Sequence, residues 1–214
     1  PLKQFRPTRD LLHVSGLLLT GDTLDVFVCH LPSRSGGAKE SEPYRLHAAR
    51  ILYTEADSIL NIRLHPQIII MGDFNDYPTN KSIQKILEAE APPVTTNNLA
   101  STTGSTNFST VAPSSLKLYH LLARKAKSKD FGSYKYRGEW GLLDHLIVSG
   151  TLLNQSNHFF TSEEKANVCL LPFLLKDDEK YGDKEPFRTY KGMKYQGGVS
   201  DHLPIYADFE LILY

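Results

Sequence analysis

The chain has 214 residues, 41% of them hydrophobic and 10% aromatic, and its 24 Lys and Arg side chains balance 24 Asp and Glu side chains. This size and composition predict one globular domain with a substantial core. The balanced charge excludes a global positive field that would hold polyanions, so a nucleic-acid substrate would have to be recognised locally.

The first predicted element is a β-hairpin over residues 11–31, where two apolar runs flank the turn sequence TGDT. A loop rich in Ser and Gly follows. Residues 42–64 then repeat apolar side chains at spacings of three and four, which predicts a helix with one core-facing stripe. Ser41 is its expected cap, and Pro43 suits the first turn because the first amide protons of a helix lack intrahelical acceptors.

The next elements favour mixed α/β layers. Residues 67–74 read as a buried strand, and residues 79–90 as a short helix that Thr79 would cap. Residues 92–115 are rich in Pro, Ser, Thr and Asn and predict a long connection. The remaining expected elements are a helix with a basic tail over 116–130, two strands over 133–140 and 141–150, and a final strand over 206–214.

Cysteine content and hydropathy narrow the class further. Cys29 and Cys169 are too few for a disulfide framework and lack CxxC spacing, so we expect both to be buried free thiols. No apolar stretch approaches the roughly 20 residues that a membrane-spanning helix needs. Because the sequence begins at Pro1 without a signal peptide, we expect further residues upstream, and nothing in it indicates a compartment.

Several predicted strands carry polar side chains at or near an end. One such side chain alone is typical of a turn former or a structural histidine. A buried carboxylate, however, costs several kcal/mol unless a partner or a metal compensates it, so the recurrence of this pattern indicates a shared site. The polar side chains are His30, Asp73, Asn75, Asp144, Asp201 and His202.

Two spacings suggest how these groups could work. In extended backbone, residues i and i+2 point the same way, so we expect Asp73 and Asn75 to grip one water or one phosphate oxygen together. Asp201 and His202 are neighbours and would face opposite sides of a regular strand. The chain must therefore turn there if both serve one pocket, and the nearby glycines and proline favour such a turn.

The segments CHLPS, MGDFND, WGLLDHLIVS and GGVSDHLP resemble, in this order, successive motifs of the endonuclease/exonuclease/phosphatase superfamily. Its members include deoxyribonuclease-I-like nucleases, apurinic endonucleases, inositol polyphosphate phosphatases and sphingomyelinases. The resemblance extends from about residue 11 to residue 210, and GDFND with a later SDHLP is its specific part. It implies an α/β fold, namely the C-terminal portion of a four-layer α/β/β/α sandwich, and Mg²⁺- or Mn²⁺-dependent hydrolysis of a phosphate ester.

Carried over to this sequence, the resemblance implies that Asp73 and Asn75 orient the attacking water and contact the phosphate. Asp201 would help to bind the metal, a hard cation that prefers oxygen ligands. His202 would be the general base or the charged partner of the phosphate, and Asp144 would hold it in the right tautomer.

Four further residues are candidates for contact with the substrate. His30 would contact the phosphate or protonate the leaving group. Arg34 and Arg45 could hold a substrate phosphate bidentately, with an ordinary ion pair as the alternative. Arg188 lies in residues 185–198, which would form either a substrate-facing loop or a polar connection.

The chain departs from the family pattern at its start. Complete members carry, upstream of CHLPS, an Asn-bearing strand and a strand that ends in a Glu metal ligand, and nothing before Asp10 supplies them. We therefore expect residues 1–214 to be one domain that lacks these N-terminal strands. The upstream part of the same protein, or a partner chain, would then complete the metal site.

Other readings stay open. The chain could be a catalytically incomplete fragment or a binding domain that retains the sandwich, whereas a serine hydrolase based on Ser200 is disfavoured because no GxSxG elbow is present. The substrate could be a nucleic acid, a phospholipid headgroup or another phosphate ester, although no stripe of basic and aromatic residues is evident. We expect Tyr136 and Trp140 to be packing residues. The histidines expected to be structural are His13, His47, His65, His120, His145 and His158.

Overall fold

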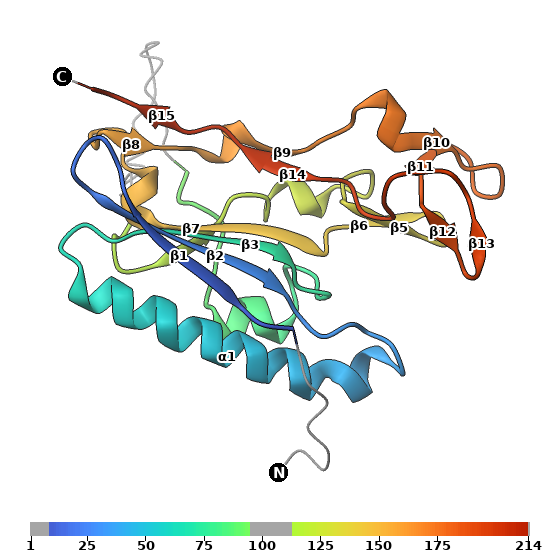
Figure 1. Ribbon diagram of the computed structural model, residues 1–214, viewed down its shortest axis with the longest axis horizontal. Helices are drawn as coiled ribbons and strands as arrows, with labels where there is room; N and C mark the ends of the chain where they lie inside the picture. The colour runs from blue at the N-terminus through green and yellow to red at the C-terminus, as the bar shows by residue number, and fades with distance from the viewer. Residues whose placement is uncertain (1–8, 95–112, 214) are drawn as a thin grey trace, which may run out of the picture.

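The computed structural model describes residues 9–94 and 113–213, so the connection predicted over residues 92–115 lies mostly outside it. Within the described residues, the central element is a five-stranded mixed sheet with the order β1-β2-β3-β7-β4 (Figure 1). Only β2 and β3 run parallel among its neighbours. The hairpin predicted over residues 11–31 is confirmed as β1 and β2. The strands are β1 (Leu12–Leu17), β2 (Thr23–His30), β3 (Gln67–Asp73), β4 (Leu118–His120) and β7 (Asp144–Ser149).

The long helix α1 (Ala38–Ile62) covers one face of this sheet (Figure 1). Its buried Leu52 and Leu60 pack with Phe27 from β2 and with Ile68 and Ile70 from β3 to form the first core. No described helix has both the length and the apolar character that a membrane crossing requires.

The beginning of α1 differs from the prediction. The helix begins at Ala38 rather than at residue 42, and Gly37 is its N-terminal flanking residue. Ser41 is not the cap, because its hydroxyl lies inside the first turn and donates to the carbonyl of Gly37 at 2.6 Å. Pro43 therefore lies within the helix, beyond the first turn.

A second layer lies on the face of the sheet opposite α1 (Figure 1). It contains two short antiparallel pairs, β9 (Ala166–Val168) with β14 (Ile205–Ala207), and β8 (Phe159–Phe160) with β15 (Glu210–Leu211). Ile69 from β3 packs with this layer in the second core, so β3 is buried on both faces. The mixed α/β class is thereby confirmed, while the four-layer arrangement stays a prediction.

Three short hairpins gather at one end of the molecule (Figure 1). They are β5 (Tyr134–Tyr136) with β6 (Glu139–Gly141), β10 (Leu175–Asp177) with β11 (Lys184–Pro186), and β12 (Tyr190–Lys191) with β13 (Lys194–Tyr195). The short helical turns are η1 (Ser82–Ile86), η2 (Lys125–Lys127), η3 (Gly150–Leu153), η4 (Glu163–Lys165) and η5 (Pro172–Leu174).

Three sequence predictions about the elements are wrong. The helix expected over residues 116–130 is β4 followed by turns, because pairing with β7 overrides its helical pattern. The strand expected over 133–140 is the β5–β6 hairpin, which turns at Arg137 and Gly138 with φ of +53° and +88°. The final strand is divided into β14 and β15.

Two further expectations hold in part. The helix expected over residues 79–90 is reduced to the π-helical turn η1, and Thr79 does not cap it. Both cysteines are free, as predicted, but only Cys29 is fully buried, and burial raises the pKa of its thiol to about 12. Cys29 is therefore a packing residue of the first core.

A buried histidine pair joins β4 and β7 to the turn after β3. The rings of His120 and His145 are in hydrogen-bond contact, and neither side chain is exposed. The backbone amide of Leu122 donates to His120 Nδ1 at 3.0 Å, and His145 Nε2 lies 2.8 Å from the carbonyl oxygen of Asp76. These contacts require both rings to be neutral, each with one donor and one acceptor nitrogen.

The last residues of β3 approach β2 very closely. Gly72 has a φ of +129°, and a Cβ atom added there would lie 2.0 Å from the carbonyl oxygen of Cys29. A side chain at this position would therefore clash with the neighbouring strand as well as strain the backbone. Glycine is required here, directly before Asp73.

The close approach at Gly72 predicts a large cost for Gly72→Ala. The variant should lower the free energy of unfolding by roughly 2–4 kcal/mol, because it adds backbone strain and a steric clash. The matched control is Gly16→Ala, since a Cβ at Gly16 would meet nothing within 4 Å. Urea denaturation compares the two, and equal stabilities would contradict the proposed constraint.

The neutral histidine pair predicts acid sensitivity. Burial lowers the pKa of His145 to about 4 from the ordinary 6.5 and lowers that of His120 well below its ordinary value. The unfolded chain therefore binds more protons than the folded chain between these two pH values. The stability that the neutral histidine contributes is fully present above pH 6.5 and is lost as the pH falls toward 4. His145 alone should contribute roughly 3 kcal/mol of this loss.

Two measurements check this expectation, urea denaturation as a function of pH and NMR titration of the His145 ring. The ring resonances should not titrate near the ordinary histidine value. A midpoint at that value in the folded protein would contradict the neutral pair.

Candidate active site

Three strands of the central sheet place a polar side chain in one row. His30 is the register partner of Asp73 in the parallel pair β2–β3, and Asp73 is the register partner of Asp144 in the antiparallel pair β3–β7. His30 Nε2 lies 3.3 Å from Asp73 Oδ2. The sheet thus brings together residues that the sequence carries in three separate motifs.

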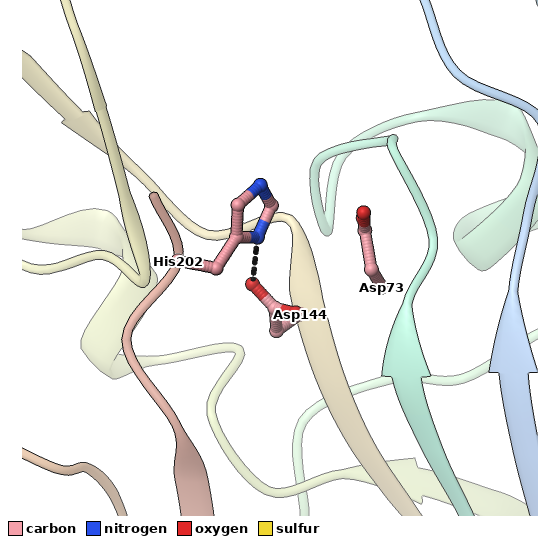
Figure 2. A group of neighbouring side chains, drawn as sticks. All are labelled: Asp73, Asp144 and His202. Carbon is pink, nitrogen blue, oxygen red and sulfur yellow. Dashed lines mark hydrogen bonds and ion pairs between the residues drawn. The ribbon is translucent and has the colours of Figure 1, made fainter. Parts of the chain in front are cut away.

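His202 joins this row from the segment before β14. Its backbone forms an isolated bridge with Tyr134, and its Nδ1 lies 2.7 Å from Oδ2 of Asp144 (Figure 2). The hydroxyl of Ser133 donates to the same carboxylate oxygen. Asp73, Asp144 and His202 each offer a possible ligand atom, and these atoms lie within 4.8 Å of one another.

The bond to Asp144 fixes the orientation of the imidazole. Asp144 accepts the Nδ1–H of His202, which leaves Nε2 as the ring nitrogen that can exchange a proton. Figure 2 shows this second nitrogen pointing away from Asp144. Asp144 and His202 thus form a carboxylate–imidazole pair whose Nε2 is available for proton exchange and points away from the sheet.

The turn after β3 corrects one expectation from the sequence. Asn75 has a φ of +51°, a left-handed conformation that Asn tolerates better than most residues. Its backbone amide donates to Asp73 Oδ1 at 2.7 Å, and its Nδ2 donates to Asp73 Oδ2 at 3.0 Å and to the carbonyl of Leu31 at 3.1 Å. The backbone is therefore not extended between the two residues. Asn75 donates hydrogen bonds to the Asp73 carboxylate, whereas the sequence analysis expected the two side chains to grip one water or phosphate oxygen together.

The surroundings raise the pKa values of both Asp73 and His202. Burial raises the pKa of Asp73, and the hydrogen bond from Asn75 and the charge of His202 offset this only in part. Burial would lower the pKa of His202, but the hydrogen bond to Asp144 and the charges of Asp144, Asp73 and Asp201 raise it above its ordinary value. The imidazole therefore keeps its proton to a higher pH than an ordinary histidine does.

Asp201 and Ser200 precede His202 on an exposed turn. Asp201 is exposed, and its negative charge raises the pKa of the adjacent imidazole. The hydroxyl of Ser200 accepts the backbone amide of His202 at 3.1 Å. This backbone contact gives no support to a serine nucleophile activated by the imidazole.

Arg45 does not lie where the sequence analysis expected it. Its side chain is only 1% exposed, its Nε lies 2.7 Å from Oδ1 of Asp76, and its Nη atoms donate to Ser41 and to the carbonyl of Ala38. Asp76 also accepts the hydroxyl of Ser82. Since every one of these contacts is internal, Arg45 stabilises the buried Asp76 and is closed to a substrate.

The other two arginines remain accessible. Arg34 is 29% exposed, lies 3.9 Å from Asp76 and stacks over the ring of Tyr77 at 4.7 Å. Arg188 donates to the carbonyl of Lys135 at 2.7 Å, and its guanidinium lies 5.3 Å from the ring centre of Tyr134. Tyr134 in turn lies 4.9 Å from the His202 ring, so Arg188 belongs to the surroundings of the imidazole.

Sequence reasoning missed Ser133 and Tyr134, which contact Asp144 and His202. Neither residue carries a motif, and only the β5–β6 hairpin brings them to the site. Tyr136, expected to be a packing residue, is 55% exposed, whereas Trp140 packs against the second core.

The family model described as Endonuclease/Exonuclease/phosphatase family matches residues 3–211. No curated protein sequence matches the chain significantly.

Three solved structures illustrate the structural likeness. The mannosyl-6-phosphatase of Bacteroides thetaiotaomicron is 14% identical with a TM-score of 0.46, and the match covers 89% of this chain and 52% of that protein. A humanized D. rerio TDP2 is 13% identical with a TM-score of 0.48, covering 94% and 60%. The human Nocturnin catalytic domain is 18% identical with a TM-score of 0.42, covering 96% and 60%.

The chain thus spans between 52% and 60% of the length of these three structures. At such low identity, the structural likeness carries no information about the substrate of this chain. The family match covers nearly the whole sequence, and it shows that the chain belongs to the Endonuclease/Exonuclease/phosphatase family.

Proposed function

We propose that the chain is a divalent-metal-dependent hydrolase of phosphate esters. The observation that carries this proposal is the convergence of Asp73, Asp144 and His202, whose ligand atoms lie within 4.8 Å of one another at one end of the sheet. Family membership supports hydrolysis of a phosphate ester as the reaction class.

The donor set fits a hard divalent cation. Mg²⁺ typically binds one or two carboxylates and completes its shell with water and substrate phosphate, and Mn²⁺ accepts similar ligands. Because Asp144 and His202 Nδ1 are bonded to each other, Asp73 is the carboxylate of this group that we assign to the ion. We keep the exposed Asp201, which precedes His202 in the chain, as a proposed second ligand. When bound, the ion would neutralise negative charge on the phosphoryl oxygens.

The chain's own residues would orient the substrate and manage the proton. Asp144 holds the imidazole of His202 so that Nε2 faces the reacting group, and the raised pKa of His202 favours the protonated form. His202 then acts first as the charged partner of the phosphate and, when deprotonated, as the general base for water. Asn75 fixes the Asp73 carboxylate, which orients the attacking water.

Three peripheral residues complete the proposal. His30 lies 3.3 Å from Asp73 and is 46% exposed, so it could contact the phosphate or protonate the leaving group. Arg34 and Arg188 remain candidates for binding substrate phosphate, since each presents a guanidinium near the site.

The proposal predicts metal-dependent hydrolysis that requires His202. With Mg²⁺ or Mn²⁺, the full chain should hydrolyse bis(4-nitrophenyl) phosphate, and EDTA should abolish the reaction. His202→Ala should lower kcat by about 100-fold or more, because a positioned acid or base is lost. The matched control is His65→Ala, since His65 is exposed and lies outside the site. Equal rates for the two variants would contradict the assignment.

A second candidate is a catalytically incomplete unit. It is favoured by the open face of β1 and β2 opposite α1, where Leu12, Val14 and Val28 are 56%, 52% and 39% exposed. An upstream part of the same protein or a partner chain could cover this face and supply further metal ligands. If hydrolysis appears only when the upstream part is present, this candidate replaces the first for the chain alone.

A further inference from the structure

Two hairpins beside His202 interleave basic and aromatic residues. The β5–β6 hairpin carries the sequence YKYRGEW, and the β12–β13 hairpin carries TYKGMKYQ. Figure 1 shows both at the end of the molecule where β3 ends and β7 begins. The two stretches are far apart in the sequence, so the stripe that they form becomes visible only in the folded chain. We call this surface the basic–aromatic face; it consists of Tyr134, Tyr136, Arg137, Arg188, Tyr190, Lys191, Lys194 and Tyr195.

The face begins at the imidazole. The ring of Tyr134 lies 4.9 Å from that of His202 and stacks on Tyr136 at 6.4 Å with an interplanar angle of 12°. The guanidinium of Arg188 lies over Tyr134, and that of Arg137 lies 5.2 Å from the ring centre of Tyr136. On the β5–β6 hairpin, aromatic rings and cations thus extend outward from the proposed catalytic group.

The β12–β13 hairpin and the residues that flank it contain cations but no carboxylate. Residues 186–198 contain Arg188, Lys191 and Lys194 but no Asp or Glu. Lys191 and Lys194 are direct cross-strand partners in the hairpin, an arrangement of like charges that destabilises a strand pair. A bound anion would relieve this repulsion.

The neighbouring hollow shows that the surplus charge is not cancelled locally. Lys191 and Arg188 line a cavity of about 270 Å³ together with Arg137 and Lys180. The two carboxylates of this hollow, Asp178 and Glu185, already pair with Lys135 at 3.2 Å and Lys176 at 3.3 Å. Among the described residues, Nε of Arg188 is buried without a hydrogen-bond partner.

We infer that the basic–aromatic face binds a single-stranded nucleic acid and leads it to His202. Several cations spaced along the face suit a ligand whose phosphates repeat, and exposed rings suit unpaired bases, which stack on aromatic side chains. Tyr136, Tyr190 and Tyr195 are 55%, 58% and 64% exposed, so their rings are accessible. The inference rests on the proposed phosphoesterase function and names the substrate class for that site.

The test measures binding separately from hydrolysis. Fluorescence anisotropy in EDTA gives the affinity of the full chain for labelled single-stranded DNA and RNA of about 12 nucleotides. Tyr136→Ala should weaken binding about fivefold or more, whereas Tyr136→Phe, which keeps the ring, should not. The double variant Lys191→Ala/Lys194→Ala should weaken binding and flatten the dependence of log K on log salt by about 1.4.

The matched control for the lysine pair is Lys85→Ala/Lys117→Ala, which removes two exposed lysines outside the face and should leave binding unchanged. Hydrolysis of bis(4-nitrophenyl) phosphate should also be unchanged in both double variants, because none of the four lysines is among the residues proposed to bind the metal or the small ester.

The outcomes separate the two proposals. If the face variants bind oligonucleotides as well as the unaltered chain does, the inference is overturned, even when the small ester is hydrolysed. If the variants lose oligonucleotide binding but no ester is hydrolysed with metal, the binding inference holds and the proposed reaction fails. If the two lysines are needed for binding to anionic lipid vesicles but not for binding to oligonucleotides, the face binds a membrane surface and the inference is overturned.

Discussion

The pairing of β3 between β2 and β7 determines where the proposed catalytic groups lie. Its register aligns His30, Asp73 and Asp144 in one row at the end of the sheet. Gly72 permits the close approach to β2 that this register requires. His202 lies on a distant segment, and its bond to Asp144 attaches that segment to the row. The site is therefore built mainly on paired strands, which hold side chains more precisely than loops do.

Compensation of buried charge distinguishes Asp76, a structural carboxylate, from Asp73, the carboxylate of the proposed site. Asp76 is enclosed by Arg45 and Ser82, so its charge is satisfied entirely within the protein. Asp73 is only partly compensated, and its pKa is raised. Incomplete compensation at a partly exposed carboxylate is a property expected of a group that binds an external cation or substrate. The two residues lie in one turn of the chain but differ in this respect.

The sequence predicted the β1–β2 hairpin, the strand β3 and most of α1, because long apolar runs with a clear period identify them. It misassigned residues 116–130, since the buried pairing of β4 with β7 outweighs a local helical pattern. The motifs singled out Asp73, Asp144 and His202, which the structure brings close together, but they gave no information on Ser133 or Tyr134, which lie at and beside the β5–β6 hairpin. The buried position of Arg45 depends on α1 beginning at Ala38. The basic–aromatic face depends on contacts of Arg188 with Lys135 and Tyr134, which are far from it in the sequence.

The central claim is that one divalent ion binds where the side chains of Asp73, Asp144 and His202 converge. Anomalous diffraction from crystals of the full chain soaked in Mn²⁺ tests it most directly. The account predicts an anomalous peak within about 2.5 Å of a carboxylate oxygen of Asp73 or Asp201. A well-occupied manganese site elsewhere in the molecule, with none at these carboxylates, would contradict it.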